Sequence, residues 1–198
     1  PLAALDLKRK QEILPYLERL HDELDIPVLY VSHSPDEVAR LADYLVAMEG
    51  GRVLASGLLA ETLARLDLPI RLGEDAGAIL DGTVGEVDSE WHLARVDFDG
   101  GSLWARDQGL SVGRRVRVRV LARDVSLASE PGTSSIQNLL RGQIDAVGDD
   151  EHPGLALVRV RVGNSVMLAR LTKRAMAALD ISKGRDVWVQ VKSVALLE

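Results

Sequence analysis

An internal repeat in the second part of the sequence constrains the fold more than any other feature. Three segments recur in the same order: Asp81–Val87 matches Arg141–Val147, Val96–Arg106 matches Val160–Arg170, and Leu110–Val120 matches Ile181–Val191. Each copy contains roughly five short runs of alternating apolar and polar residues, separated by polar turns, which is typical of strands with one buried face. The repeat therefore predicts an all-β, OB-like barrel or sandwich that occurs twice.

The two copies extend over about residues 78–128 and 134–198 and differ in length. The spacing between matching glycines is 31 residues in the first copy, from Gly82 to Gly113, and 42 residues in the second. The additional residues include Thr172–Leu179, for which the sequence predicts a short helix with Thr172 as its N-cap.

Composition excludes several classes of function. The chain has 198 residues, a net charge of −6, 46% hydrophobic residues and no cysteine. The negative charge argues against a general nucleic-acid-coating protein, because binding phosphates needs a positive surface. Without cysteine there are no disulfides, thiolate nucleophiles or cysteine-based zinc sites, and we assign no metal site to the chain. No apolar run approaches the roughly 20 residues that span a bilayer.

The first seventy residues follow a different, α/β pattern. Apolar residues recur at helical spacing after Asp6, a suitable N-cap, and predict a helix that continues to Asp25. Pro15 within this run predicts a kink or a late start of the helix. The apolar run Pro27–Val31 then predicts a short, buried parallel strand.

The pattern continues after this strand with further short elements. We expect a helix at Glu37–Asp43, a hairpin formed by Tyr44–Met48 and Arg52–Ala55, and a third helix at about Leu58–Leu66. The stretch from Pro69 to Ala78 has the composition of a linker, which separates a first part, residues 1–72, from a second part, residues 73–198.

His33 lies directly after the predicted strand and just before the helix at Glu37–Asp43. Open α/β sheets bind ligands beyond the carboxyl ends of their parallel strands. A histidine there can donate a hydrogen bond to a phosphate oxygen or to an attacking water, although a structural role is the alternative for a single histidine. His33 is therefore a candidate site residue.

Several motifs of the first part resemble the distal half of an ABC transporter nucleotide-binding domain. They are Pro1–Asp6, Val31–Ser34, Asp36–Ala39, Glu49–Val53 and Gly57. The resemblance implies that Asp6 belongs to the D-loop, which acts across a dimer, and that His33 is the switch histidine that contacts the γ-phosphate of ATP. It also implies ATP and Mg²⁺ as cofactors of the parent protein.

Other motifs of an ATPase are missing from the sequence. It contains no G-x-x-x-x-G-K-[ST] loop, no Leu-Ser-Gly-Gly signature and no Walker B carboxylates. Phosphoryl transfer depends on positioning and on charge stabilisation by the groups that hold the phosphates and Mg²⁺. We therefore expect that the parent protein is an ATPase and that this chain alone does not hydrolyse ATP.

Arginines alternate with valines over Arg114–Val120, so most of these arginines share one face of a strand. This face is either solvated or in contact with an oxyanion. Nucleic acid is a weaker alternative because no aromatic residues interleave with the arginines to form a stacking platform.

The second part resembles the molybdate-binding Mop (TOBE-type) module, although a simple turn between copies could also account for Thr133–Asn138. The resemblance rests on Ser135-x-x-Asn138, Arg170-Leu-Thr172 and Val191-Lys192-Ser193. In that family, serine, lysine and backbone donors hold the oxyanion between modules. The resemblance implies an oxyanion site with these candidate residues: Ser135, Asn138, Thr172, Lys192 and Ser193. A tetrahedral dianion needs convergent donors and positive charge rather than a metal.

Together the two resemblances imply a partial α/β ABC nucleotide-binding domain followed by a duplicated all-β OB-like (Mop/TOBE) domain. They indicate the ATP-binding subunit of a molybdate or tungstate importer, on the cytoplasmic face of the cell membrane. Its implied partners are a second copy of itself, membrane permease subunits and molybdate, which would regulate transport. The alternatives are a stand-alone molybdate storage or sensor module, or the ATPase subunit of a sulfate, iron or sugar importer.

Two further expectations concern the chain by itself. A hydrolase built on one of the four histidines ranks low, because no catalytic motif adjoins His21, His33, His92 or His152, and the other three are more simply interpreted as surface residues. A partial α/β domain exposes apolar surface and a sheet edge, so we expect self-association through residues 1–70.

Overall fold

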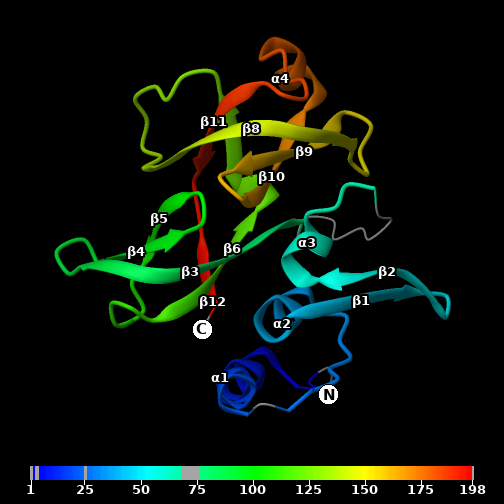
Figure 1. Ribbon diagram of the computed structural model, residues 1–198, viewed down its shortest axis with the longest axis vertical. Helices are drawn as coiled ribbons and strands as arrows, with labels where there is room; N and C mark the ends of the chain where they lie inside the picture. The colour runs from blue at the N-terminus through cyan, green and yellow to red at the C-terminus, as the bar shows by residue number, and fades with distance from the viewer. Residues whose placement is uncertain (1, 3–4, 25, 68–75, 198) are drawn as a thin grey trace.

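The computed structural model describes residues 2, 5–24, 26–67 and 76–197 of the chain. In these residues, strands predominate. Two five-stranded antiparallel sheets form the larger part, and three helices with a two-stranded hairpin form the smaller, N-terminal part, below and to the right of the sheets in Figure 1. None of the described helices combines the length and hydrophobicity that crossing a membrane requires.

Helix α1 (Leu7–Glu23) begins where the sequence predicts it. The carboxylate of Asp6 accepts a hydrogen bond from the backbone N–H of Arg9 at 2.9 Å and so satisfies one of the unpaired N–H groups at the helix start. Pro15 lies within the helix. Helix α2 (Pro35–Leu41) begins after Ser34, whose hydroxyl accepts from the N–H of Glu37. Both helices confirm the sequence prediction to within a few residues.

The hairpin also confirms the prediction. Strand β1 (Tyr44–Glu49) pairs antiparallel with β2 (Arg52–Leu58), and helix α3 (Leu59–Leu63) follows directly. Gly50 and Gly51 at the turn have φ values of 55° and 76°. A two-residue turn with both φ values positive suits glycine, because a Cβ atom would be strained there.

The predicted parallel strand at Pro27–Val31 is wrong. These residues form no strand, and Leu29 and Val31 are 93% and 77% exposed. A parallel strand needs neighbours on both sides and helices over both faces. The described residues contain no parallel strand pair, so this apolar run has no sheet to join. Most of the predicted linker, residues 68–75, lies outside the described residues.

The strands of the β part form two sheets. In sheet 1 the order is β12 (Ala195–Leu197), β6 (Arg115–Leu121), β3 (Gly77–Asp88), β4 (Leu93–Phe98) and β5 (Gly101–Arg106). In sheet 2 the order is β10 (Ser165–Thr172), β9 (Leu155–Val162), β8 (Asn138–Asp149), β11 (Asp186–Val191) and β7 (Val125–Ala128). A 3₁₀ turn, Ala122–Asp124, precedes β7, and helix α4 (Lys173–Ala178) follows β10.

Each copy of the repeat contributes its last strand to the other sheet. Strand β7 comes from the first copy but pairs with β11, and β12 comes from the second copy but pairs with β6. One apolar core spans both sheets and includes fully buried residues from each, among them Val84 and Val118 of sheet 1 and Val160 and Val189 of sheet 2. Because the strands are exchanged and the core is shared, neither copy completes a sheet by itself.

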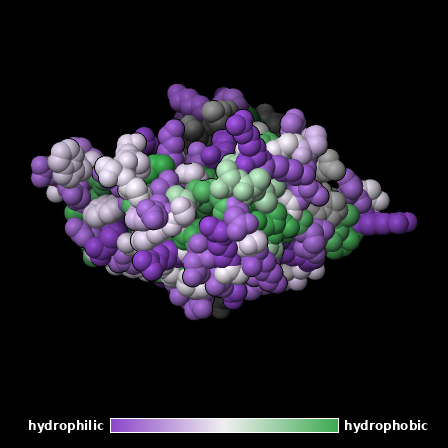
Figure 2. All heavy atoms as spheres, turned by 90° about the horizontal axis from the view of Figure 1, so that it is seen from above, coloured by the Kyte–Doolittle hydropathy of each residue, from purple (hydrophilic) through white to green (hydrophobic). Residues whose placement is uncertain are grey.

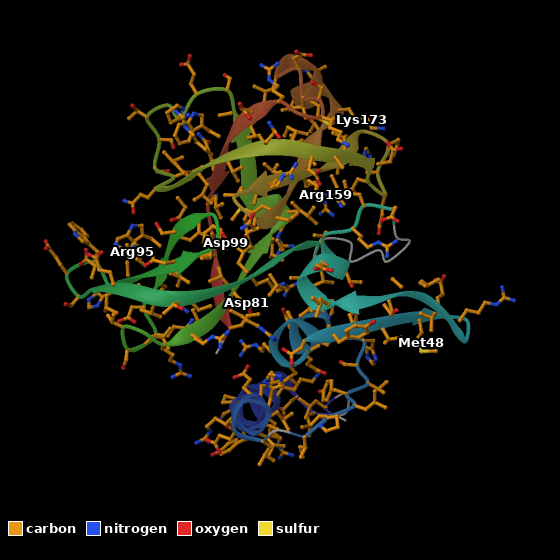
Figure 3. All side chains as sticks on the ribbon, viewed as in Figure 1. Met48, Asp81, Arg95, Asp99, Arg159 and Lys173 are labelled. Atoms are coloured by element: carbon orange, nitrogen blue, oxygen red, sulfur yellow. The ribbon has the colours of Figure 1, made fainter. Side chains whose placement is uncertain are left out.

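The sheets also meet at two hairpins. Asp99, labelled in Figure 3, accepts hydrogen bonds from Asn164 at 2.9 Å and from the hydroxyl of Ser165 at 2.6 Å. Gly100 packs so closely here that an added Cβ would lie 2.1 Å from the carbonyl oxygen of Val162. Only glycine fits this approach of the two hairpins.

Candidate functional site

The structure places His33 on the surface, between Ser32 and the helix cap Ser34. What holds this segment is Glu37, which is only 3% exposed. Its carboxylate accepts hydrogen bonds from Ser32 at 2.6 Å, from Tyr30 at 2.9 Å and from Lys10 at 2.9 Å. The backbone on the N-terminal side of His33 is therefore fixed to α1 and α2 by one buried carboxylate.

The ionisation of this cluster follows from its contacts. Burial raises the pKa of Glu37, but hydrogen bonds from Ser32, Lys10 and Tyr30 outweigh it and lower that pKa to about 2. Burial, together with the hydrogen bond to Glu37, raises the pKa of Tyr30 to about 12. Glu37 is thus a carboxylate and Tyr30 a phenol at neutral pH.

Asp6, the other predicted catalytic residue, lies at the start of α1, whereas His33 precedes α2. The carboxylate of Asp6 caps α1 and lies 3.7 Å from the guanidinium of Arg9. No group of three or more histidine, aspartate or glutamate residues in the described part of the chain could hold a metal ion. With no phosphate-binding loop in the sequence, the residues present do not fit Mg²⁺–nucleotide by themselves.

Three of the predicted oxyanion residues lie at one end of sheet 2. Ser135 lies in the loop before β8, and Lys192 and Ser193 follow β11, whose last residue Val191 pairs with Asn138. All three side chains are exposed. The backbone N–H of Lys192 donates to the carbonyl oxygen of Asp124 at 2.9 Å, so it is the side chain that can meet a ligand. This cluster supplies two hydroxyl groups and one ammonium group.

Asn138 has a structural role that the sequence did not predict. It is 8% exposed, and its side chain bridges the two sheets by accepting from the N–H of Trp104 at 2.7 Å and donating to the carbonyl oxygen of Trp104 at 3.0 Å. These bonds satisfy backbone groups of edge strand β5, as a further strand would. One amide hydrogen of Asn138 is left over for a ligand.

Thr172 lies far from this cluster. It is the N-cap of α4, where its hydroxyl accepts from the N–H of Ala175 at 3.1 Å, as the sequence predicts. Lys173, the next residue, contacts Asp149 at the opposite end of β8 from Asn138, and Figure 3 shows it at that end. The strand path from Asn138 to Asp149 is about 35 Å at 3.3 Å per residue. The structure therefore does not bring Thr172 together with Ser135, Lys192 and Ser193 in one chain.

Two of the alternating arginines contact the N-terminal part. Arg117 donates to the carbonyl oxygens of Ala42 at 2.9 Å and Arg40 at 3.4 Å, and forms an ion pair with Asp43. Arg119, which is 8% exposed, forms an ion pair with Asp36. These two arginines are neither simply solvated nor turned toward an oxyanion.

Within the N-terminal part, His21 contacts the same aspartate as Arg117 does. Its Nε2 lies 2.6 Å from Asp43, although the sequence suggested only a surface residue. Burial raises the pKa of Asp43, but the hydrogen bonds from His21 and Arg117 outweigh it and lower that pKa. The alternation of arginine and valine predicted that the arginines share one face of a strand, but no local pattern in the sequence indicated the residues that they contact.

Two hollows lie elsewhere on sheet 2. One, of about 420 Å³, lies beside α4 and is lined by residues that include Val147, Met176, Ala177 and Ile181. Figure 2 views the molecule from this end and shows apolar surface among largely hydrophilic side chains. The other, of about 590 Å³, is lined by Arg141, Arg161 and Trp188 among others. The predicted site residues line neither hollow.

Comparison with known proteins gives a match to the second copy of the repeat and further matches to the whole chain. The TOBE domain family matches residues 134–197. Over the whole chain, 76% of residues are identical to a molybdenum import ATP-binding protein ModC of Methylococcus capsulatus, and 63% to one of Thiobacillus denitrificans. The resemblance to the ATP-binding subunits of molybdate importers therefore covers the entire chain. The chain spans 56% and 55% of the length of these two relatives.

A solved structure resembles the β part. The cytoplasmic molybdate-binding protein ModG, crystallised with molybdate bound, has a TM-score of 0.51 and 25% sequence identity to this chain. The match covers 60% of the chain and 93% of the ModG chain. The likeness agrees with the predicted OB-like architecture of the sheets. The α/β architecture expected for the first part requires a parallel sheet. The described residues contain only antiparallel strand pairs.

Proposed function

We propose that this chain is part of the ATP-binding subunit of a molybdate or tungstate importer, with residues 1–72 in the nucleotide-binding domain and 73–198 in a regulatory oxyanion-binding domain. The observation that carries the proposal is the continuous similarity to ModC relatives, which includes both the His33 segment and the two sheets. In this proposal the repeat copies are residues 78–128 and 134–198, and the first part belongs to an α/β ABC domain.

In the complete subunit, His33 would contact the γ-phosphate of ATP and Asp6 would act across a dimer of ATP-binding subunits. Glu37 supports this role for His33, because two of its hydrogen bonds hold Tyr30 and Ser32 in the segment before His33. The third bond, from Lys10, connects Glu37 to α1. ATP and Mg²⁺ would need further groups for phosphate binding, so the chain alone should not hydrolyse ATP. The subunit would lie at the cytoplasmic face of the membrane, against permease subunits.

The oxyanion site would lie between two copies of the chain. Ser135, Lys192 and Ser193 provide one half, with a positive charge suited to a dianion. Thr172 would provide the other half from the second copy, since the two groups lie at opposite ends of β8 within one chain. The Thr172 hydroxyl accepts from Ala175, so its hydrogen can still be donated to an oxyanion.

Molybdate bound there would regulate transport through its different affinity for two arrangements of the dimer. Bound molybdate would favour the arrangement in which the ATP-binding parts are separated, and would lower the ATPase rate of the assembled importer. A stand-alone storage or sensor module is the second candidate, favoured by the likeness to ModG. That likeness covers 60% of the chain, whereas the similarity to ModC relatives also covers the helical part.

A mixing experiment tests the shared site. Thr172→Asp keeps an N-cap for α4 but places a negative charge at the oxyanion, and Lys192→Ala removes the positive charge. Each variant alone should bind molybdate at least tenfold more weakly than the wild type in calorimetry. In a mixed dimer, one of the two sites carries neither substitution and the other carries both. Random pairing in a 1:1 mixture makes about half of the dimers mixed, so the mixture should recover about a quarter of the wild-type binding sites.

The controls separate folding from binding. Thr172→Ser keeps both the cap and the hydroxyl and should bind as the wild type does. If the mixture binds no more molybdate than the separate variants, the site lies within one chain. If neither substitution changes the affinity, the assigned residues are wrong. Equal affinity for sulfate would contradict the choice of molybdate and favour a sulfate importer.

A further inference from the structure

The outer face of sheet 1 holds a helix end. Arg117 of β6 is held by Asp81, the residue directly opposite it on β3, at 3.4 Å. From there it donates to two carbonyl oxygens at the end of α2 and forms an ion pair with Asp43 just beyond that end. Carbonyls at a helix C-terminus lack partners and carry partial negative charge, so a guanidinium is a suitable cap.

The repeat places a similar pair on the outer face of sheet 2. Asp81 corresponds to Arg141, and Arg117 corresponds to Trp188, which lie directly opposite each other on β8 and β11. The guanidinium of Arg141 lies 4.9 Å from the ring centroid of Trp188. In each sheet, the residue directly opposite the arginine holds the guanidinium on the outer face. On sheet 1 the arginine is on the later strand, β6, whereas on sheet 2 it is on the earlier strand, β8.

On sheet 2 this face is hollow rather than occupied. The hollow of about 590 Å³ is lined by Arg141 and Trp188, with Gln143, Arg161, Asp186 and Ser129 around them. Arg161 lies opposite Gln143 on β9, and its partly exposed guanidinium forms an ion pair with Asp145 at 3.8 Å. Gln143 and Asp186 bond to each other at 3.2 Å. The lining contains two arginines and one aspartate, and because Arg161 is paired with Asp145, its positive charge is concentrated at Arg141.

The chain itself covers only one side of this face. Gln190, which corresponds to Arg119, donates to the carbonyl oxygen of Pro131 in the loop before β8 at 3.2 Å. That loop occupies the place where α2 begins on sheet 1. The part of the face around Arg141 and Trp188 stays uncovered. On sheet 1, the corresponding position is covered by the end of α2 and by Asp43.

We propose that this hollow binds the C-terminal end of a helix from a partner protein, followed by an acidic residue. Arg141 would cap the last carbonyl groups and pair with the carboxylate, as Arg117 does on sheet 1, while Trp188 provides a flat apolar wall. Charge complementarity favours an acidic helix end over a basic one. The proposal concerns a surface separate from the oxyanion site and does not depend on it.

Fluorine NMR of the chain labelled with 5-fluorotryptophan tests this directly. The chain contains three tryptophans, Trp91, Trp104 and Trp188, so each resonance can be assigned with single phenylalanine variants. The probe is a stapled helical peptide ending in Leu-Ala-Asp, the order found at residues 41–43. We expect a saturable shift of the Trp188 resonance alone. A matched peptide ending in Leu-Ala-Lys should produce at least tenfold weaker binding.

Variants of the chain provide the second arm. Arg141→Gln should weaken the binding of the acidic peptide about tenfold or more, as loss of a charged hydrogen bond does. Arg174→Gln, an exposed arginine on α4, should leave it unchanged. An unchanged Trp104 resonance shows that the variants remain folded.

Four results would overturn the proposal. The first is no shift of the Trp188 resonance with the acidic peptide, and the second is equal binding of both peptides. The third is the same shift with inorganic phosphate alone, which would indicate a site for small anions. The fourth is a Trp188 resonance that depends on protein concentration and no longer responds to peptide, which would assign the face to a second copy of the chain.

Discussion

Arg119 of β6 forms an ion pair with Asp36 in the first turn of α2, three residues after His33. Strand β6 pairs in turn with β12, which begins two residues after Ser193. A short path of backbone pairing and ion pairs therefore joins the proposed oxyanion residues to the helix that follows the proposed switch histidine. Arg117 strengthens this junction at the other end of α2.

We predict that Arg117→Met loosens the junction. The variant loses the bonds to Ala42 and Arg40 as well as the ion pair with Asp43, and about 1–3 kcal/mol of docking free energy is expected to go with them. Hydrogen exchange at the amides of α2 should become faster, while the amides of sheet 2 keep their protection. Arg115→Met is the control, because Arg115 is exposed at the start of the same strand. Equal exchange in both variants would contradict the assignment.

A second prediction concerns the pH dependence of the Glu37 cluster. The pKa of Glu37 in the folded chain is about 2, below its ordinary value of 4.5. The ionised carboxylate therefore contributes stability that is complete above about pH 4.5 and is lost as the pH falls toward 2.

Glu37→Gln removes this contribution. At pH 7 it should destabilise the N-terminal part by about 2 kcal/mol, because the variant leaves the Lys10 ammonium without its carboxylate. The difference between variant and wild type should shrink as the pH falls from 5 to 2. Hydrogen exchange at α2 over this pH range measures it, and a difference that is independent of pH would show that the ionised form is not what stabilises the segment.

A third prediction separates structure from ligand binding at Asn138. Asn138→Ala leaves the N–H and carbonyl groups of Trp104 without their partner and should lower the free energy of unfolding of the β part by about 2 kcal/mol in urea titrations. Asn164→Ala, which removes one exposed bond to Asp99, should cost well under 1 kcal/mol. If Asn138→Ala unfolds like the wild type, the bridge between the sheets is not important for stability.

A fourth prediction concerns the exposed apolar residues of the first part. Leu29 and Val31 are 93% and 77% exposed, next to other exposed apolar residues such as Val28 and Ile26. We expect association that increases with concentration in sedimentation velocity. Leu29→Glu should reduce it, whereas Val112→Glu, an exposed valine of the β part, should not. A monomer at all concentrations would contradict this expectation.

Local patterns predicted the elements whose stability is local. The caps at Asp6, Ser34 and Thr172 are hydrogen bonds within one helix turn, so the sequence determines them nearly alone. The hairpin turn at Gly50 and Gly51 is equally local. The repeated alternation likewise predicted two five-stranded units.

Features that depend on distant partners could not be predicted. The run Pro27–Val31 has the composition of a buried strand, but a strand forms only where a neighbour is present. Alternation cannot tell which sheet a terminal strand joins, so the exchange of β7 and β12 was not foreseen. For Asn138, the motif indicated a ligand residue, which stays a prediction, and no local pattern indicated its additional structural role against Trp104.

Titration calorimetry of the chain with molybdate, with sulfate and ATP–Mg²⁺ as controls, is the decisive experiment for the proposed oxyanion-binding domain. We expect saturable molybdate binding at least tenfold tighter than that of sulfate, no binding of ATP–Mg²⁺, and loss of molybdate binding in Lys192→Ala. A chain that binds molybdate no more tightly than sulfate, or equally well after Lys192→Ala, would contradict this proposal.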